Sequence, residues 1–145
     1  MSRRAAIAMS DAEVAAFLAE QRTLTCGTIG RDGFPHLMPL WYVVRDSECW
    51  AWTYAKSQKV RNLERDARCT IEVDAGERYE ELRGVMMKCA AAIHRDPETV
   101  LGVGRELAAR YSGSAELVDE RQVAKRVALQ FVTSTSASWD HRKLA

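Results

Sequence analysis

The stretch Thr23–Thr53, TLTCGTIGRDGFPHLMPLWYVVRDSECWAWT, decides the fold, because it contains three strand-like segments in quick succession. The segments are rich in β-branched, aromatic and other apolar residues, and they span 23–29, 35–44 and 48–53. Glycine, aspartate and serine mark the turns between them, at 30–33 and 45–47. Strands joined by such short turns pair antiparallel, so the stretch predicts the beginning of an antiparallel sheet.

The sequence on either side alternates between helical and strand-like patterns. Ser10 and Glu13 form a capping box at the start of a helix. The predicted helices cover 11–21, 56–66 and 97–111, with a further helical turn within 119–126. The remaining predicted strands cover 69–73, 81–93 with a bend at Gly84, and 127–133 with alternation continuing toward Trp139.

These elements predict a mainly β fold with six or so antiparallel strands plus three helices. Closing such a sheet into a barrel buries one face without leaving exposed edges. Residues 1–9 are expected to form an N-terminal arm, and residues 10–145 a single domain.

Composition excludes several classes of partner. The 145 residues include 21 Lys and Arg against 20 Asp and Glu, so the net charge is +1 and nothing global favours nucleic acid or an anionic membrane. No segment is long and apolar enough for a membrane helix, and the N-terminus does not read as a signal peptide, so a cytoplasmic protein is expected. The four cysteines lack metal-site or disulfide-framework spacing and are expected to be buried, reduced thiols.

The segment Trp52–Leu63, WTYAKSQKVRNL, carries the clearest signal for a binding site. A strand is predicted to end near Thr53 and a helix to begin near Ser57, where unpaired amides and the helix dipole favour an anion. A candidate phosphate cradle is completed by two hydroxyls, from Thr53 and Ser57, and by three cations, which are Lys56, Lys59 and Arg61. The alternative interpretation is a solvated basic helix start.

The segment Pro35–Trp41 and the C-terminal tail give weaker signals. Pro39 cannot donate a ladder hydrogen bond, so its strand is expected at a sheet edge or with a bulge at Pro39. Such a strand can present backbone groups to a flat ring, on which Trp41 would stack. The alternative interpretation is that Trp41 belongs to the core. His36 would then be an ordinary polar residue, since no catalytic triad pattern is present. Trp139 lies either in a docked or frayed tail or beside a site at a dimer interface.

Four motifs, in this order along the chain, carry a resemblance to a known family: GRDGFPHLMPLWYVV, WTYAKSQKVRNLERD, RYEELRGV and SWDHRKL. From about Ser10 to Leu144 the chain resembles the pyridoxamine 5′-phosphate oxidase-like superfamily of flavin and deazaflavin oxidoreductases. It is most similar to the actinobacterial branch that uses coenzyme F420. The vitamin B6 oxidases have Ser-Arg-Lys where this chain has Ser57-Gln58-Lys59, so the resemblance does not extend to their activity.

The resemblance implies a split β-barrel homodimer with two cofactor sites at the subunit interface. It implies that Thr53, Ser57, Lys59 and Asn62 lie along the cofactor phosphate, with Lys59 the best match to the family's cofactor-binding lysine. Backbone from Met38 to Trp41 would line the ring, and Tyr79 matches an aromatic position near it. The full set of expected cofactor-binding residues is His36, Met38, Pro39, Leu40, Trp41, Thr53, Ala55, Lys56, Ser57, Lys59, Arg61, Asn62, Tyr79 and Trp139.

The expected function is that of a reductase that uses reduced F420 to deliver hydride to an electron-poor double bond. Candidate acceptors are enones, quinones and tetrapyrroles such as biliverdin. The cofactor does the chemistry, so no catalytic side chain and no metal is expected. The alternatives are an FMN-dependent oxidoreductase with the same cradle, a non-catalytic cofactor carrier, and a structural dimer whose basic segment is only surface.

Overall fold

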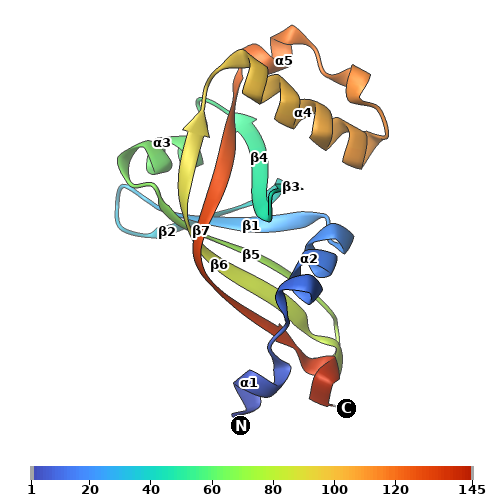
Figure 1. The fold of residues 1–145 in the computed structure, drawn as a ribbon. Coiled ribbons are helices and arrows are strands. Elements are labelled where there is room, and N and C mark those ends of the chain that lie inside the picture. The colour runs from blue at the N-terminus through green and yellow to red at the C-terminus, as the bar shows by residue number, and fades with distance from the viewer. Residues whose placement is uncertain (1, 145) are drawn as a thin grey trace.

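The computed structural model of the chain describes residues 2–144 (Figure 1). Its strands are β1 (Thr23–Ile29), β2 (Pro35–Trp41), β3 (Val43–Arg45), β4 (Glu48–Tyr54), β5 (Arg68–Ala75), β6 (Arg83–His94) and β7 (Arg126–Asp140). Its α-helices are α1 (Arg3–Ile7), α2 (Asp11–Glu20), α3 (Gln58–Arg65), α4 (Pro97–Ser112) and α5 (Glu120–Ala124). Three short 3-10 turns complete the described residues: η1 (Tyr79–Glu81), η2 (Ala115–Leu117) and η3 (His141–Leu144).

The strands form one antiparallel sheet in the order β2-β1-β5-β6-β7-β4-β3. Its two edge strands, β2 and β3, are separated in the chain by Tyr42 alone. One residue spans about 3.8 Å, whereas strands at opposite edges of a flat sheet of this size would lie several spacings of about 4.8 Å apart. The sheet must therefore curl back on itself, and Figure 1 shows this as a partly open barrel with α4 and α5 at one end and both termini at the other.

The predicted fold class is confirmed, with corrections in detail. The segment 35–44 is two strands rather than one, because the chain breaks at Tyr42 and crosses the barrel opening there; this gives seven strands instead of six. Pro39 does lie in an edge strand, but β1 and β2 pair in an unbroken register, so the alternative of a bulge at Pro39 was wrong. A register shift occurs elsewhere, between Lys88 and Cys89 of β6. Two short helices, α1 and α5, bring the α-helices of residues 2–144 to five.

Helix α2 packs against the main core of the barrel. Its predicted capping box is present, with Glu13 N donating to Ser10 Oγ and Ser10 N to the Glu13 carboxylate. Phe17 and Leu18 of this helix are buried in the main core. Tyr42 is fully buried beside them and donates to Leu18 O at 2.7 Å. A second apolar cluster joins α4 to the outside of the barrel through Val100, Val103 and Leu107.

All four cysteines are buried and unpaired, as expected. Burial raises the pKa of the Cys49 thiol to about 12, which keeps it protonated. Within residues 2–144 there is no cluster of His, Cys, Asp or Glu suited to a metal ion, and no helix long and apolar enough to cross a membrane.

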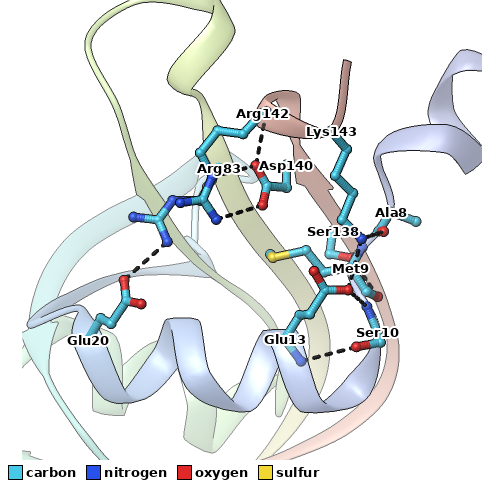
Figure 2. A network of polar contacts seen from close by, with 10 residues as sticks. All are labelled: Ala8, Met9, Ser10, Glu13, Glu20, Arg83, Ser138, Asp140, Arg142 and Lys143. Carbon is cyan, nitrogen blue, oxygen red and sulfur yellow. Dashed lines mark hydrogen bonds and ion pairs between the residues drawn. The ribbon is translucent and has the colours of Figure 1, made fainter. Parts of the chain in front are cut away.

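The C-terminal tail is docked on its own chain (Figure 2). Lys143 Nζ donates to Ala8 O and to the Glu13 carboxylate, both at 2.8 Å. Met9 N donates to Ser138 Oγ at 2.9 Å, and Arg142 pairs with Asp140. These contacts join the tail to the segment before α2, and they favour the interpretation of a docked tail over that of a frayed one.

Gly84 lies near the start of β6, where it pairs with Trp139 of β7. A Cβ atom at Gly84 would overlap the Trp139 ring. The glycine is therefore needed for the close approach of this tryptophan to the sheet.

Glu72 on β5 gives the stability a pH dependence. Burial, and then the neighbouring Asp74, raise the pKa of Glu72 to about 7, whereas an unfolded glutamate titrates near 4.3. Between about pH 4.5 and 7 the Glu72 carboxyl group keeps its proton in the folded state and loses it in the unfolded state, so the free energy of unfolding falls as pH rises through this window.

We expect Glu72→Gln to raise the free energy of unfolding at pH 8 by up to about 1 kcal/mol, after allowing for solvent screening, and to change it little at pH 4.5. Urea unfolding at both pH values measures this, with exposed Glu77→Gln as control; an equal gain at both values would contradict it.

Candidate functional site

The junction between β4 and α3 has an incompletely paired helix start. Ser57 is the N-cap residue of α3, but its side chain makes no capping hydrogen bond. Its Oγ atom is buried and has no hydrogen-bond partner within residues 2–144. An N-cap serine normally accepts from an amide two or three residues later. Both the hydroxyl and the first-turn amides of α3 are therefore left available to a ligand.

Lys59, on the first turn of α3, points into the protein rather than into bulk water. It is 7% exposed, and its Nζ donates to Thr53 Oγ1 at 2.8 Å. No carboxylate of residues 2–144 lies within 4.0 Å of it. Burial lowers the pKa of this ammonium group. An ammonium with one neutral partner has two unused donors and no compensating charge, which is costly unless an anion binds there.

A cleft of about 490 Å³ opens beside this junction, between α3 and the turn that connects β1 to β2. It is lined by His36, Gln58 and Asn62 together with residues of that turn. The Nδ1 atom of His36 is buried without a partner among residues 2–144, like the Ser57 hydroxyl. The Asn62 amide is already engaged: it donates to Thr28 Oγ1 at 3.0 Å and accepts from Gln58 Nε2 at 2.8 Å. Asn62 thus holds α3 against β1, and part of the hydrogen-bonding capacity of its side chain is used within the protein.

A second cleft, of about 500 Å³, lies where the barrel is open between β2 and the end of β4; we call it the seam cleft. Its lining residues are Thr23, Pro39, Leu40, Trp41, Trp52, Thr53, Tyr54, Leu107 and Arg126. Trp41 is 56% exposed and stacks on Tyr111 of α4, with ring centroids 4.5 Å apart. Thr53 lines this cleft and also accepts from Lys59, so the seam cleft adjoins the junction.

The other predicted residues of this region differ in their exposure and in whether their polar groups are already hydrogen-bonded. Lys56 is exposed, and Arg61 is exposed with a 3.9 Å contact to Glu64. The Ala55 amide donates to Lys125 O at 2.9 Å, so it is not free for a ligand. Met38 is 43% exposed on β2, between the residues that line the two clefts.

Tyr79 and Trp139 are not brought to this region within one chain. Thr53 pairs with Val127 near the start of β7, whereas Trp139 lies near the end of that strand. Tyr79 lies on η1 beside the tail, where its ring contacts His141 edge-on at 4.6 Å. Figure 1 shows α3 and the C-terminus far apart along the curled sheet.

Sequence reasoning missed Gln58, Trp52, Leu107 and Arg126 as lining residues. Gln58 and Trp52 fall inside the quoted junction motif, but neither is charged, so the charge pattern does not identify them. Leu107 and Arg126 come from α4 and β7, which no local pattern connects to β2. Only the packing of α4 and the pairing of β7 with β4 bring them to the seam cleft.

The residues of the junction fit an anionic group such as a phosphate. They offer a buried ammonium, an unpaired hydroxyl and free helix amides, and no carboxylate of residues 2–144 lies within salt-bridge distance of Lys59. The adjoining cleft adds the unpaired imidazole nitrogen of His36. The aromatic side chains of the neighbouring seam cleft suit a flat ring.

Comparison with known proteins identifies the family. The family model described as pyridoxamine 5′-phosphate oxidase matches residues 10–140. The conserved hypothetical protein Rv2991 from Mycobacterium tuberculosis is 42% identical, and its crystal structure has a TM-score of 0.92, covering 99% of this chain and 92% of that one. No curated protein matches the chain.

More distant solved structures share the fold. A protein described as an F420 reductase is 19% identical, with a TM-score of 0.66 over 84% of this chain and 94% of that one. The FAD and heme binding protein from Mycobacterium smegmatis is 16% identical, with a TM-score of 0.77 over 90% of this chain and 71% of that one. Because the family model spans nearly the whole barrel, the chain belongs to the pyridoxamine 5′-phosphate oxidase family.

Proposed function

We propose that this protein is a reductase that uses reduced coenzyme F420 to deliver hydride to an electron-poor double bond of a small molecule. The observation that carries the proposal is the Lys59 ammonium, which is buried, has one neutral partner and has no carboxylate within salt-bridge distance among residues 2–144. A bound phosphate supplies the missing charge and accepts the unused donors.

The surrounding groups support the same ligand. Ser57 Oγ and the first-turn amides of α3 donate to a phosphate, while His36 Nδ1 contacts it or the adjoining chain of the cofactor. Exposed Lys56 and Arg61 add positive charge beside the junction, which suits the glutamates of the F420 tail. The edge strand β2 borders both clefts and presents Met38 to Trp41 to the ring.

The cofactor supplies the hydride when bound, and the protein supplies position and exclusion of water. Lys59 and Ser57 hold the phosphate end, which fixes the ring along β2. Trp41 and Trp52 provide flat apolar surface against which an acceptor is held. No side chain is assigned a proton-transfer role.

We also propose that the protein acts as a homodimer. Tyr79 and Trp139 lie at the opposite end of the sheet from Lys59 in one chain, so a second copy is needed to bring them to the cofactor. Ile29, Leu37 and Val132 leave large apolar side chains exposed, as a subunit interface requires.

The deciding experiment is a fluorescence titration of the purified protein with F420 and with FMN, on material whose mass in solution is known. We expect micromolar F420 affinity with one cofactor per chain of a dimer, and weaker FMN binding. Co-purified FMN with no F420 binding would favour the FMN-dependent alternative. If bound reduced F420 is not oxidised by a panel of enones, quinones and biliverdin, the carrier alternative replaces the reductase.

A pair of serine variants separates binding from stability. Ser57→Ala is expected to weaken F420 binding about tenfold while leaving the free energy of unfolding unchanged, because this hydroxyl caps nothing. Ser10→Ala removes a working cap of α2 and is expected to cost about 1 kcal/mol of stability without changing F420 affinity. Urea unfolding and the F420 titration measure both effects. Equal stability losses in the two variants would show that Ser57 is an ordinary cap.

A further inference from the structure

Arg126 occupies an unusual position at the rim of the seam cleft. Its guanidinium carbon lies 4.6 Å from the ring centroid of Trp52 and 4.3 Å from that of Tyr54. Its Nη1 donates to Gln122 O at 3.2 Å, which fixes the group to the end of α5. The guanidinium is thus held by two aromatic rings and one backbone carbonyl, a rigid arrangement for a long side chain.

Arg126 also lacks the acidic partner that several other arginines have. Arg45, Arg68, Arg83, Arg95 and Arg142 each lie close to a carboxylate. No carboxylate of residues 2–144 lies within 4.0 Å of Arg126. Among the described residues, one of its five N–H donors has a protein partner, so a fork of donors stays available beside the cleft.

The rest of the seam cleft combines aromatic and aliphatic side chains with the hydroxyls of two threonines. Trp41 presents an exposed ring whose stacking on Tyr111 holds it in place, and Trp52 and Leu107 also line the cleft. A cavity of about 290 Å³ beneath α4 and α5 shares these three residues and extends the apolar surface. Aromatic walls of this kind favour planar ligands.

We infer that the seam cleft receives a planar conjugated hydride acceptor that carries a carboxylate, and that Arg126 is the residue that recognises this carboxylate. The inference rests on the proposed function, because it takes the cofactor to be held at the junction around Lys59 with its ring along β2, and it assigns the remaining space of the seam cleft, beside Trp52 and Arg126, to the acceptor. It narrows the acceptors from any electron-poor double bond to planar acids, and it disfavours neutral enones and quinones.

The test compares two probes of nearly the same shape, 2-naphthoate and its neutral amide, 2-naphthamide, by calorimetric titration of the whole protein. We expect naphthoate to bind wild-type protein about tenfold more tightly than naphthamide. Arg126→Gln should abolish this preference while leaving naphthamide and F420 affinities unchanged, and Arg126→Lys should restore part of it. Arg105→Gln, which removes an exposed arginine of α4 outside the cleft, should change nothing.

The other possible outcomes of this titration also discriminate between the hypotheses. Equal affinities for the two probes, no binding of either, or a preference that survives Arg126→Gln would overturn the inference. A loss of F420 affinity in Arg126→Gln, with unfolding unchanged, would assign the cleft to the cofactor instead. An Arg126-dependent preference in a protein that does not bind F420 would support carboxylate recognition and refute the proposed function alone.

Discussion

Replacing Lys59 with methionine is expected to lower F420 affinity by roughly ten- to a hundredfold. The change removes one charge-assisted contact to phosphate, which contributes about 1.5–3 kcal/mol. Methionine keeps an unbranched side chain of similar length, so the packing of α3 against the barrel is preserved.

The same substitution should not weaken the fold, which makes the prediction specific. The ammonium is buried and lacks a carboxylate partner among residues 2–144, so in the absence of a ligand its removal relieves a desolvation penalty. We expect the free energy of unfolding to stay the same or rise by about 1 kcal/mol. If Lys59 had only a structural role, its replacement would lower the free energy of unfolding and leave the F420 affinity unchanged.

The control is Lys56→Met, in the same junction. Lys56 is exposed, so solvent screens its charge and we expect only a few-fold loss of F420 affinity. Fluorescence titration and urea unfolding of both variants give the required comparison. Unchanged affinity in Lys59→Met would refute the cofactor site proposed here.

Replacing Gly104 with alanine is expected to destabilise the protein by about 2 kcal/mol, although alanine is the better helix former. Gly104 is buried in α4, and a Cβ atom there would overlap the Trp52 ring. Overpacking of this kind costs about 1–3 kcal/mol and exceeds the gain of up to about 1 kcal/mol from helix propensity. The displaced Trp52 would also change the shape of the seam cleft.

Gly102, two residues earlier in the same helix, provides the matched control. A Cβ atom at Gly102 would meet only the end of the flexible Arg45 side chain, at 3.2 Å. We expect Gly102→Ala to stabilise the protein by about 0.5–1 kcal/mol. Urea unfolding of the two variants should shift in opposite directions. If both gain stability, the helix is not held against Trp52 as tightly as the structure indicates.

Local patterns were sufficient for most of the secondary structure. The capping box of Ser10 and Glu13 correctly predicted the start of α2, because capping involves only neighbouring residues. Alternating β-branched and aromatic residues likewise predicted β1 and β4 to within one residue. The strand-to-helix change at 53–58 was visible for the same reason, and it identified the junction before any packing was known.

Long-range pairing decided what these patterns left open. The segment 35–44 looks like one strand because its composition is uniform, yet Tyr42 is anchored by the end of α2 and turns the chain to the opposite sheet edge. Lys59 looks like a solvated lysine in a basic run, and only the barrel interior determines that it is buried on Thr53.

The sequence by itself determined most of the elements, the antiparallel class and a basic strand-to-helix junction, because these depend on propensities and spacings over a few residues. The tertiary structure alone decided that Lys59 is buried without an acidic partner in residues 2–144, that Tyr79 and Trp139 lie far from it, and that Arg126 and Trp41 line the same cleft. The physical reason is that the burial of a side chain and its distance from other residues depend on which strands pair and on where the curled sheet stays open. Residues that are far apart in the chain determine both of these features.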